Sequence, residues 1–273
     1  MLADVVDCLR CPHCDGGLRL GDGSLRCDSG HSFDVARQGY VYLLPGDVRP
    51  GGDSAAMVEA REAFLRARHF APIAQAVAEA AGQPGGCVAD LGAGTGDYLA
   101  RVLDRAPDAP GLALELSKHA LRRAARAHPR IGAVGCDAWR ALPLRSRSVS
   151  VVLSVFAPRN GEEIARVLSP GGKLVVVTPT RRHLTELITP LGMLSVDERK
   201  RERLESKLSP HLAPESEAGL EWTMWLTHEE LGWLAGMGPS AFHTDAEELA
   251  ERIARLPEPM AVTASVTVSV HRS

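Results

Sequence analysis

The sequence predicts an α/β protein in which a doubly wound parallel sheet follows a small cysteine-rich module. Two observations predict the sheet: short apolar runs alternate with helix-like segments between residues 87 and 178, and the first run leads into a glycine-rich turn. The cysteines indicate the module, because four of the six fall within the first 46 residues. A chain of 273 residues is long enough for both units.

The N-terminal part of the chain divides into this module and a bridging segment. Short β-like runs and several glycines occupy residues 1–46, and a helical stretch from Ser54 to Ala81 dominates residues 47–86. The apolar residues of that stretch recur at helical spacing, which predicts a stripe facing the core; they are Met57, Ala60, Phe64 and Ala67. We expect the third unit to cover residues 87–273.

The third unit begins with five strands and three helices in alternation. The expected strands are Cys87–Leu91, Gly111–Leu116, Ile131–Gly135, Val149–Val155 and Gly172–Thr178. The expected helices are Tyr98–Arg105, Lys118–Ala127 and Glu162–Leu168. Such alternation predicts a parallel sheet with helices on both faces, and Pro170-Gly171-Gly172 is expected to turn the chain into the fifth strand.

Beyond Pro179 the alternation ends. The charged stretch Arg181–Leu208 is expected to be helical, with interruptions at Pro190 and Gly192. Thr227-His228-Glu229-Glu230 matches a capping box, which predicts a helix that begins near His228. Residues 261–270 alternate between apolar and polar side chains, so we expect a half-buried strand that forms an antiparallel edge with Leu220–Leu226.

Composition and charge narrow the functional classes. A net charge of −3 argues against a generally basic nucleic-acid coat, although residues 137–182 hold eight basic and three acidic residues. That local excess suits a phosphate-bearing substrate or reflects ordinary solvated arginines. Because no apolar run approaches about 18 residues, we expect no membrane partner. The start Met1-Leu2-Ala3-Asp4 lacks the features of a secretory signal, which predicts a cytoplasmic protein with metal-bound or free thiols.

Two short motifs in the module predict a metal site. Cys11-Pro12-His13-Cys14 and Cys27-Asp28-Ser29-Gly30-His31 form CxxC and CxxxH pairs with twelve residues between them. Three thiolates and one imidazole suit tetrahedral zinc, and four protein ligands leave no position for water, so the zinc would be structural. Cys8 and His13 are rival ligands, and unligated surface cysteines are the alternative. Cys87 and Cys136 are expected to pack in the core.

Acidic residues follow the first three strands of the expected sheet. Asp90 leads into Leu91-Gly92-Ala93-Gly94-Thr95-Gly96, a GxGxG turn whose glycines let the backbone approach a ligand. Glu115 ends the second strand, where it can accept hydrogen bonds from ribose hydroxyls, and Asp137 follows the third, the usual place of an adenine contact. Together they predict the S-adenosylmethionine site of a class I (Rossmann-like) methyltransferase domain. A helix cap is the alternative role for Asp90, and a plain loop carboxylate for Asp137.

The tip of the fourth strand restricts the chemistry. Ser154-Val155-Phe156-Ala157-Pro158 lacks the Asn or Asp followed by Pro-Pro that is usual where exocyclic adenine amino groups are methylated. It also lacks the nucleophilic cysteine that methylation of cytosine C5 requires. Ring nitrogens, oxygens and small metabolites are the remaining targets.

Further motifs carry a resemblance to a known family. They are His31-Ser32-Phe33-Asp34, Gly39-Tyr40-Val41-Tyr42-Leu43-Leu44-Pro45, Gly52-Asp53-Ser54, Phe156-Ala157-Pro158, and Thr178-Pro179 with Arg182-His183-Leu184. Over nearly its full length the chain resembles the large-subunit ribosomal RNA guanine-N1 methyltransferases, which include tylosin- and mycinamicin-resistance enzymes. The resemblance implies a zinc-ribbon-like domain that binds zinc through Cys11, Cys14, Cys27 and His31 and grips a 23S rRNA hairpin.

The resemblance also implies a reaction, cofactor contacts and an assembly. A methyl group would pass from S-adenosylmethionine to N1 of a guanine, giving macrolide (tylosin-type) resistance, and the protein would be a homodimer. Phe70, Thr95, Gly96 and His183 match cofactor-binding positions. The proton acceptor is left open between His183, Asp137 and water. Arg145, Arg147, Arg159 and Arg182 are expected phosphate contacts. Two alternatives are a small-molecule methyltransferase with a structural zinc lid and a non-catalytic zinc-dependent RNA-binding protein.

Overall fold

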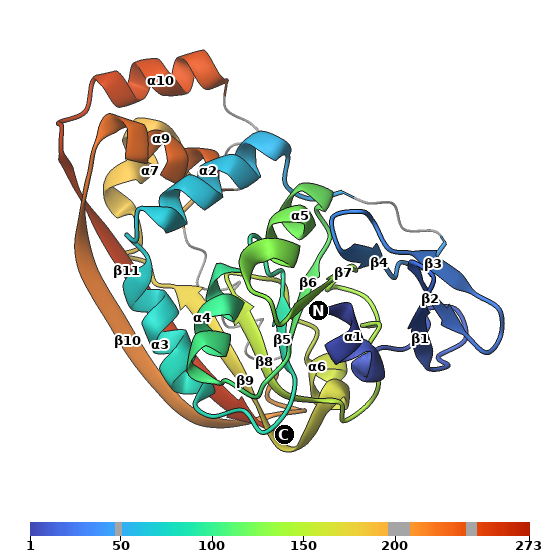
Figure 1. The fold of residues 1–273 in the computed structure, drawn as a ribbon. Helices are drawn as coiled ribbons and strands as arrows, with labels where there is room; N and C mark the ends of the chain where they lie inside the picture. Colours follow the sequence, from blue (N-terminus) through green and yellow to red (C-terminus); the bar gives the residue numbers. More distant parts are fainter. Residues whose placement is uncertain (47–50, 196–207, 239–244) are drawn as a thin grey trace.

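The computed structural model of the chain describes residues 1–46, 51–195, 208–238 and 245–273. A large sheet with helices on both faces forms the body, and a three-stranded sheet lies at one side of it (Figure 1). The α/β class predicted from the sequence is confirmed. No helix in these described ranges is long and apolar enough to cross a membrane.

The large sheet has eight strands in the order β10-β11-β9-β8-β5-β6-β7-β4. Six strands are parallel: β4 (Tyr40–Tyr42), β5 (Val88–Leu91), β6 (Gly111–Glu115), β7 (Ile131–Gly135), β8 (Val149–Val155) and β9 (Leu168–Pro179). β5 lies between β6 and β8, so the strand order reverses at its carboxyl end. That reversal creates the crevice in which doubly wound sheets bind ligands.

The last two strands form the predicted antiparallel edge. β11 (Met260–Arg272) pairs with β9 on one side and with β10 (Ala213–Leu226) on the other. Val262, Ala264 and Val266 are buried, but Ser265 and Thr267 on the opposite face are buried as well. The centre of β11 is therefore covered on both faces rather than half-buried as predicted. Both strands are longer than the segments expected from the sequence.

Helices cover the two faces of the sheet and bury separate apolar clusters. One face carries α2 (Ala55–Arg66), α3 (Ala71–Ala81), α4 (Asp97–Arg105), α5 (Lys118–Ala127) and α9 (His228–Gly236). The other carries α1 (Leu2–Val5) and α6 (Gly161–Val167). α7 (Thr185–Leu191), α10 (Ala246–Ala254) and the 3-10 turn Val6–Cys8 complete the described helices. The predicted capping box at Thr227 and Glu230 is confirmed at the start of α9.

Three further local expectations from the sequence differ from the structure. The stretch from Ser54 to Ala81 is two helices, because Arg68 adopts a left-handed φ of 69° and Pro72, which has no N–H to donate, lies in the first turn of α3. Pro170-Gly171-Gly172 lies within β9 as a bulge, where the pairing jumps from Val149–Leu168 to Val151–Lys173. Of Arg181–Leu208, α7 is helical and ends at Gly192, while residues 196–207 lie outside the described residues.

The N-terminal module is joined to the large sheet rather than merely tethered to it. Its own sheet consists of β1 (Leu18–Gly21), β2 (Ser24–Cys27) and β3 (Ser32–Asp34). β4 follows directly and pairs with β7, with Val41 opposite Val134. Leu9, Leu18 and Leu25 are buried in the same apolar cluster as side chains of the large sheet. One continuous core therefore supports both parts.

Candidate functional site

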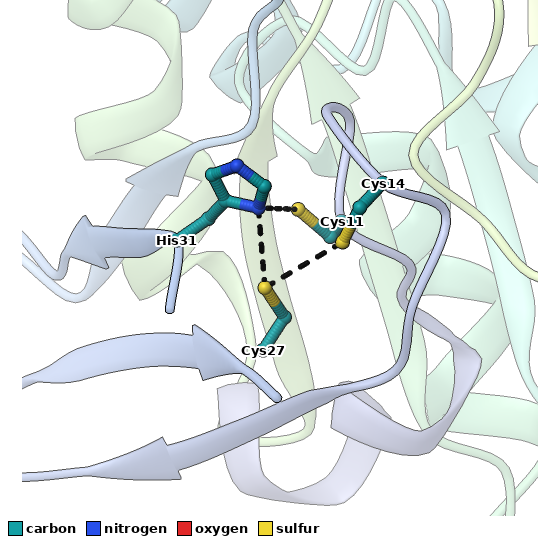
Figure 2. A group of neighbouring side chains, drawn as sticks. All are labelled: Cys11, Cys14, Cys27 and His31. Carbon is teal, nitrogen blue, oxygen red and sulfur yellow. Dashed lines mark hydrogen bonds between the residues drawn. The ribbon is translucent and has the colours of Figure 1, made fainter. Parts of the chain in front are cut away.

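Cys11, Cys14, Cys27 and His31 converge at the base of the N-terminal module. Figure 2 shows the three sulfur atoms and Nδ1 of His31 turned toward a common centre, and all four atoms lie within 4.8 Å of one another. Sγ–Nδ1 distances to His31 are 3.5 Å from Cys11 and 3.3 Å from Cys27, and the Cys14–Cys27 Sγ–Sγ distance is 3.6 Å. A zinc tetrahedron with Zn–S bonds of about 2.3 Å has edges of about 3.8 Å, so the four atoms fit that ion.

Backbone turns hold the two halves of this cluster. Cys11 N–H donates a hydrogen bond to Gly16 O, and Asp15 N–H donates one to Cys11 O. These two bonds form a turn that brings Cys11 and Cys14 to the same side of the loop. Cys27 N–H donates to His31 O at 3.1 Å and closes the second turn. The two rival ligands lie outside: Cys8 donates its thiol to Ser148 O, and the His13 ring stacks on Phe33. Cys87 and Cys136 are buried in the core, as predicted.

The glycine turn lies at the carboxyl end of β5, in the crevice where the strand order reverses. Gly92, Gly94 and Gly96 all have left-handed φ values, between 53° and 82°. A Cβ on Gly92 would lie 2.9 Å from Ala157 Cβ, and one on Gly94 would lie 3.3 Å from Arg61 Nη1. Gly96 serves as the N-cap of α4, whose first amides face the turn. The turn therefore requires glycine for its conformation and leaves bare backbone toward a ligand.

Glu115 holds the glycine turn in place from the end of β6. Its Oε2 accepts a hydrogen bond from Gly94 N–H at 2.9 Å. Its Oε1 accepts from Leu116 N–H at 2.7 Å and from Ser117 N–H at 2.9 Å. Oε1 thus uses both of its lone pairs, whereas Oε2 keeps one, so the carboxylate can still accept a hydrogen bond from one of the ribose hydroxyls that the sequence predicts as its partners.

Asp90 is a buried carboxyl group without a complete set of partners. Its side chain is 1% exposed, and Oδ2 has no hydrogen-bond partner among the described residues. Burial, and then the charge of Glu115, raise the pKa of Asp90 well above its usual range. Because Gly96 caps α4, the structure does not support the alternative in which Asp90 caps that helix. A buried acid beside the turn fits a cationic ligand group such as the methionine ammonium of S-adenosylmethionine.

Asp137 lies two residues beyond the end of β7. Its Oδ1 accepts a hydrogen bond from Trp139 N–H at 2.9 Å, and its Oδ2 lies 3.7 Å from Arg140 Nε. These contacts order the loop at the same edge of the sheet as Asp90 and Glu115. The structure thus keeps the three acids at one edge, on successive strands, as predicted.

Three rings meet beside the carboxyl ends of β8 and β9. Phe156 stacks on His183 with ring centroids 5.8 Å apart, and the two lie 6.2 Å and 6.0 Å from Phe70. His183 Nδ1 accepts a hydrogen bond from Ser265 N–H, which leaves the ring proton on Nε2. Burial lowers the pKa of His183 to about 4, so the ring is neutral near pH 7.

Comparison with known proteins identifies the family. Residues 9–49 match a zinc-ribbon family model described as "RlmA, N-terminal", and residues 88–172 match a methyltransferase-domain model. A 23S rRNA (guanine(748)-N(1))-methyltransferase of Streptomyces fradiae is 49% identical over 277 residues, covering 100% of this chain and 99% of the relative. The chain belongs to the family of 23S rRNA (guanine-N1)-methyltransferases. A candidate family member from Micromonospora griseorubida is 48% identical, covering 100% and 99% of the two chains.

Solved structures support the fold of this rRNA methyltransferase family member. A candidate methyltransferase from Bacillus halodurans superposes with a TM-score of 0.53 at 15% identity, covering 73% of this chain and 97% of its own. A chain from the complex of the Haloferax volcanii Trm112 methyltransferase activator with a candidate methyltransferase superposes with a TM-score of 0.52 at 20% identity. The match covers 81% of this chain and 98% of the chain in that complex. With its methyltransferase domain and zinc ribbon, this family member is an S-adenosylmethionine-dependent methyltransferase with a structural zinc.

The structure of this rRNA methyltransferase also places residues that the sequence reasoning did not assign to the site. Arg61 of α2 reaches the glycine turn, where it pairs with Asp53 Oδ2 and donates to Met237 O at 2.9 Å. Phe156 completes the ring cluster. Gly52-Asp53-Ser54 and Phe156-Ala157-Pro158 were visible as motifs, but their positions near the turn depend on packing between distant segments.

The expected phosphate contacts of this rRNA methyltransferase separate into two groups. Arg145, Arg147 and Arg182 are exposed, although Arg182 pairs with Glu221 and Arg145 donates to Leu9 O. Arg159 is 7% exposed, which contradicts its expected role, because a buried guanidinium cannot contact a phosphate in solvent.

Proposed function

We propose that the protein transfers a methyl group from S-adenosylmethionine to N1 of a guanine in a hairpin loop of 23S rRNA. The observation that carries the proposal is the 49% identity, over the whole chain, to a relative named as a 23S rRNA (guanine(748)-N(1))-methyltransferase. The four-ligand cluster and the glycine turn, which such an enzyme needs, are both formed. Ribosomal RNA as substrate implies action in the cytoplasm.

Side chains at the edge of the sheet would bind the methyl donor, which supplies an already activated methyl group. The proposed cofactor-binding residues are Phe70, Asp90, Gly92, Gly94, Thr95, Gly96, Glu115, Asp137 and His183. The glycine amides and Glu115 fix the turn, and the unpartnered oxygen of Asp90 offers a buried carboxyl group whose ionised form a bound cation would stabilise. The proposed zinc ligands are Cys11, Cys14, Cys27 and His31, which would hold the turns that flank the three-stranded sheet together.

The proton on guanine N1 must leave as the methyl group arrives, and His183 is poorly suited to accept it. Nδ1 is occupied by the hydrogen bond from Ser265 N–H, and Nε2 carries the ring proton. A pKa of about 4 makes a second protonation unfavourable at neutral pH. His183 can therefore donate a hydrogen bond from Nε2 and orient the base, but it is unsuited to accept the proton. This favours Asp137 or water as the proton acceptor.

A cationic surface on α5 supports an RNA substrate. The helix carries basic residues and no acid; they are Lys118, His119, Arg122, Arg123 and Arg126. Arg123 pairs with Glu62, whereas Lys118 and Arg126 are exposed and have no ion pair among the described residues. Burial, and then the charges of Lys118, Arg122 and Arg123, lower the pKa of His119. We call these five residues the α5 basic face and propose that it contacts RNA phosphates.

We further propose a role in macrolide resistance and a homodimeric assembly. Methylation of guanine N1 in the rRNA would give macrolide (tylosin-type) resistance, and two copies would form a homodimer that combines their basic faces. Resistance is tested by expressing the protein in a susceptible host, and the homodimer by light scattering of the purified protein with and without RNA.

The decisive experiment is methyl transfer to unmodified 23S rRNA, mapped by reverse transcription. A methyl group on N1 blocks the Watson–Crick edge, so we expect one new polymerase stop at a hairpin guanine. Activity that appears instead on a metabolite and is insensitive to salt would support the small-molecule alternative. Binding of S-adenosylmethionine without any stop on rRNA or ribosomes would overturn the proposal.

A further inference from the structure

The ring cluster at the ends of β8 and β9 contains one ring that is open to solvent. Phe70 is 4% exposed and is surrounded by Phe64 and Trp222, whereas Phe156 is 42% exposed. The Phe156 ring is tilted only 28° from His183, so it rests on a neighbour on one side. The Phe156 ring is therefore packed against His183 on one face and exposed to solvent elsewhere, which suits it to stack with a flat ligand.

The backbone at Phe156 shows that this exposed position is held by its surroundings. Its φ is 54°, a left-handed value that costs energy for a bulky side chain. Phe156 N–H donates to Val177 O at 3.1 Å, which ties the residue to β9. The next residue, Ala157, is buried against Gly92 of the glycine turn. The open ring is thus anchored directly beside the turn that we propose binds the methyl donor.

We propose that Phe156 is the stacking platform of the target-base subsite, on which the unstacked guanine lies while N1 is methylated. This inference rests on the proposed function. A base inside a hairpin must leave its neighbours before its Watson–Crick edge can reach a methyl donor, and an aromatic ring replaces the stacking that is lost. His183 supports the ring from beneath, and its neutral state keeps that support free of charge near pH 7.

Substitutions at Phe156 test the platform. Phe156→Ala removes the ring and Phe156→Tyr keeps it. Phe156→Gly removes the ring and relieves the left-handed backbone, so its fold is retained even if the alanine variant is destabilised. The control is Trp225→Ala, which removes another exposed aromatic ring, 63% exposed on β10 and outside the ring cluster. Each variant is assayed for kcat/KM on the rRNA hairpin and for affinity toward S-adenosylmethionine.

We expect Phe156→Ala and Phe156→Gly to lower kcat/KM by roughly 5- to 150-fold, the range for one lost base–aromatic stack. Phe156→Tyr and Trp225→Ala should stay near the wild type, and cofactor affinity should change little in all four. A hairpin with 2-aminopurine at the target position adds a direct readout. Bound to the wild type, its fluorescence should be quenched by the ring, and bound to Phe156→Gly it should be brighter.

The outcomes separate the inference from the proposed function. If the wild type methylates the hairpin and Phe156→Gly does so equally well, the platform is refuted and the function stands. If the ringless variants lose cofactor affinity in parallel with activity, Phe156 belongs to the cofactor pocket and the inference is also refuted. If the wild type leaves the hairpin unmethylated, the proposed function itself fails.

Discussion

Replacing Gly92 by alanine should damage both stability and cofactor binding, because two separate effects act at this position. Gly92 has a φ of 64°, which costs a residue with a Cβ about 1–2 kcal/mol. The new Cβ would also lie 2.9 Å from Ala157 Cβ, closer than the roughly 3.5–4.0 Å of a favourable carbon contact. Crowding of this kind in a packed region typically costs a further ~1–3 kcal/mol.

Gly23→Ala is a matched control for the conformational part of this cost. Gly23 has a similar φ of 72° in the turn between β1 and β2, but no atom lies within 4 Å of its ideal Cβ. Both variants share the left-handed strain and the reduced entropy of the unfolded chain. Their difference in the free energy of unfolding therefore isolates the contact with Ala157, and we expect Gly92→Ala to be the less stable by about 1–3 kcal/mol.

Two measurements check this reasoning. Thermal unfolding should show a lower midpoint for Gly92→Ala than for Gly23→Ala, by roughly 2–4 °C for each kcal/mol of difference. Calorimetric titration should show at least about tenfold weaker binding of S-adenosylmethionine to Gly92→Ala only, because relieving the contact displaces the turn. Equal stability and equal affinity in the two variants would refute the account of the turn.

Three further predictions follow from the site. Removing zinc with a chelator, or making Cys27→Ser, should increase amide hydrogen exchange in β1–β3, whereas binding of S-adenosylmethionine should be retained. Unchanged exchange in these strands would rule out a structural metal. Affinity for S-adenosylmethionine should rise with pH, because burial raises the pKa of Asp90 in the free protein, whereas a bound cation favours its carboxylate. Asp90→Asn should weaken binding and flatten this dependence, and calorimetric titration in two buffers should detect the proton that binding releases. The double variant Lys118→Glu with Arg126→Glu on the α5 basic face should weaken RNA binding. The slope of log Kobs against log salt concentration should become shallower by about 0.7–0.9 for each lost phosphate contact. The control Arg105→Glu on α4 should change neither quantity.

The central strands were predictable because they are buried on both faces. β5 to β8 and the second half of β9 read as largely apolar runs, and parallel sheets impose that pattern wherever helices cover both sides. The four metal ligands were equally visible, since CxxC and CxxxH spacings are set by local turns. Thr227 and Glu230 marked the start of α9 through bonds that span three residues.

Features that depend on distant segments were not predictable in the same way. Nothing near Arg68 in the sequence indicates its left-handed φ, although Pro72 marks a possible helix start. β4 is three residues long and reads as part of the module, yet its hydrogen-bond partner is β7, about ninety residues away. Arg61 and Phe156 join the site only because α2 and the tip of β8 converge on the glycine turn. Register and packing, rather than local pattern, decide these positions.

The pairing of β4 with β7 fixes where the N-terminal module sits relative to the large sheet. A strand that shares hydrogen bonds with a rigid sheet cannot swing, and a Cβ on Gly135 would lie 2.0 Å from the Tyr42 ring, so the two strands are fitted without free space. The separation between the zinc cluster and the methyl-transfer crevice is therefore constant. If the proposed rRNA hairpin contacts both places, the distance between its stem and its target base has to match this fixed separation, and hairpins of another length would be bound less well.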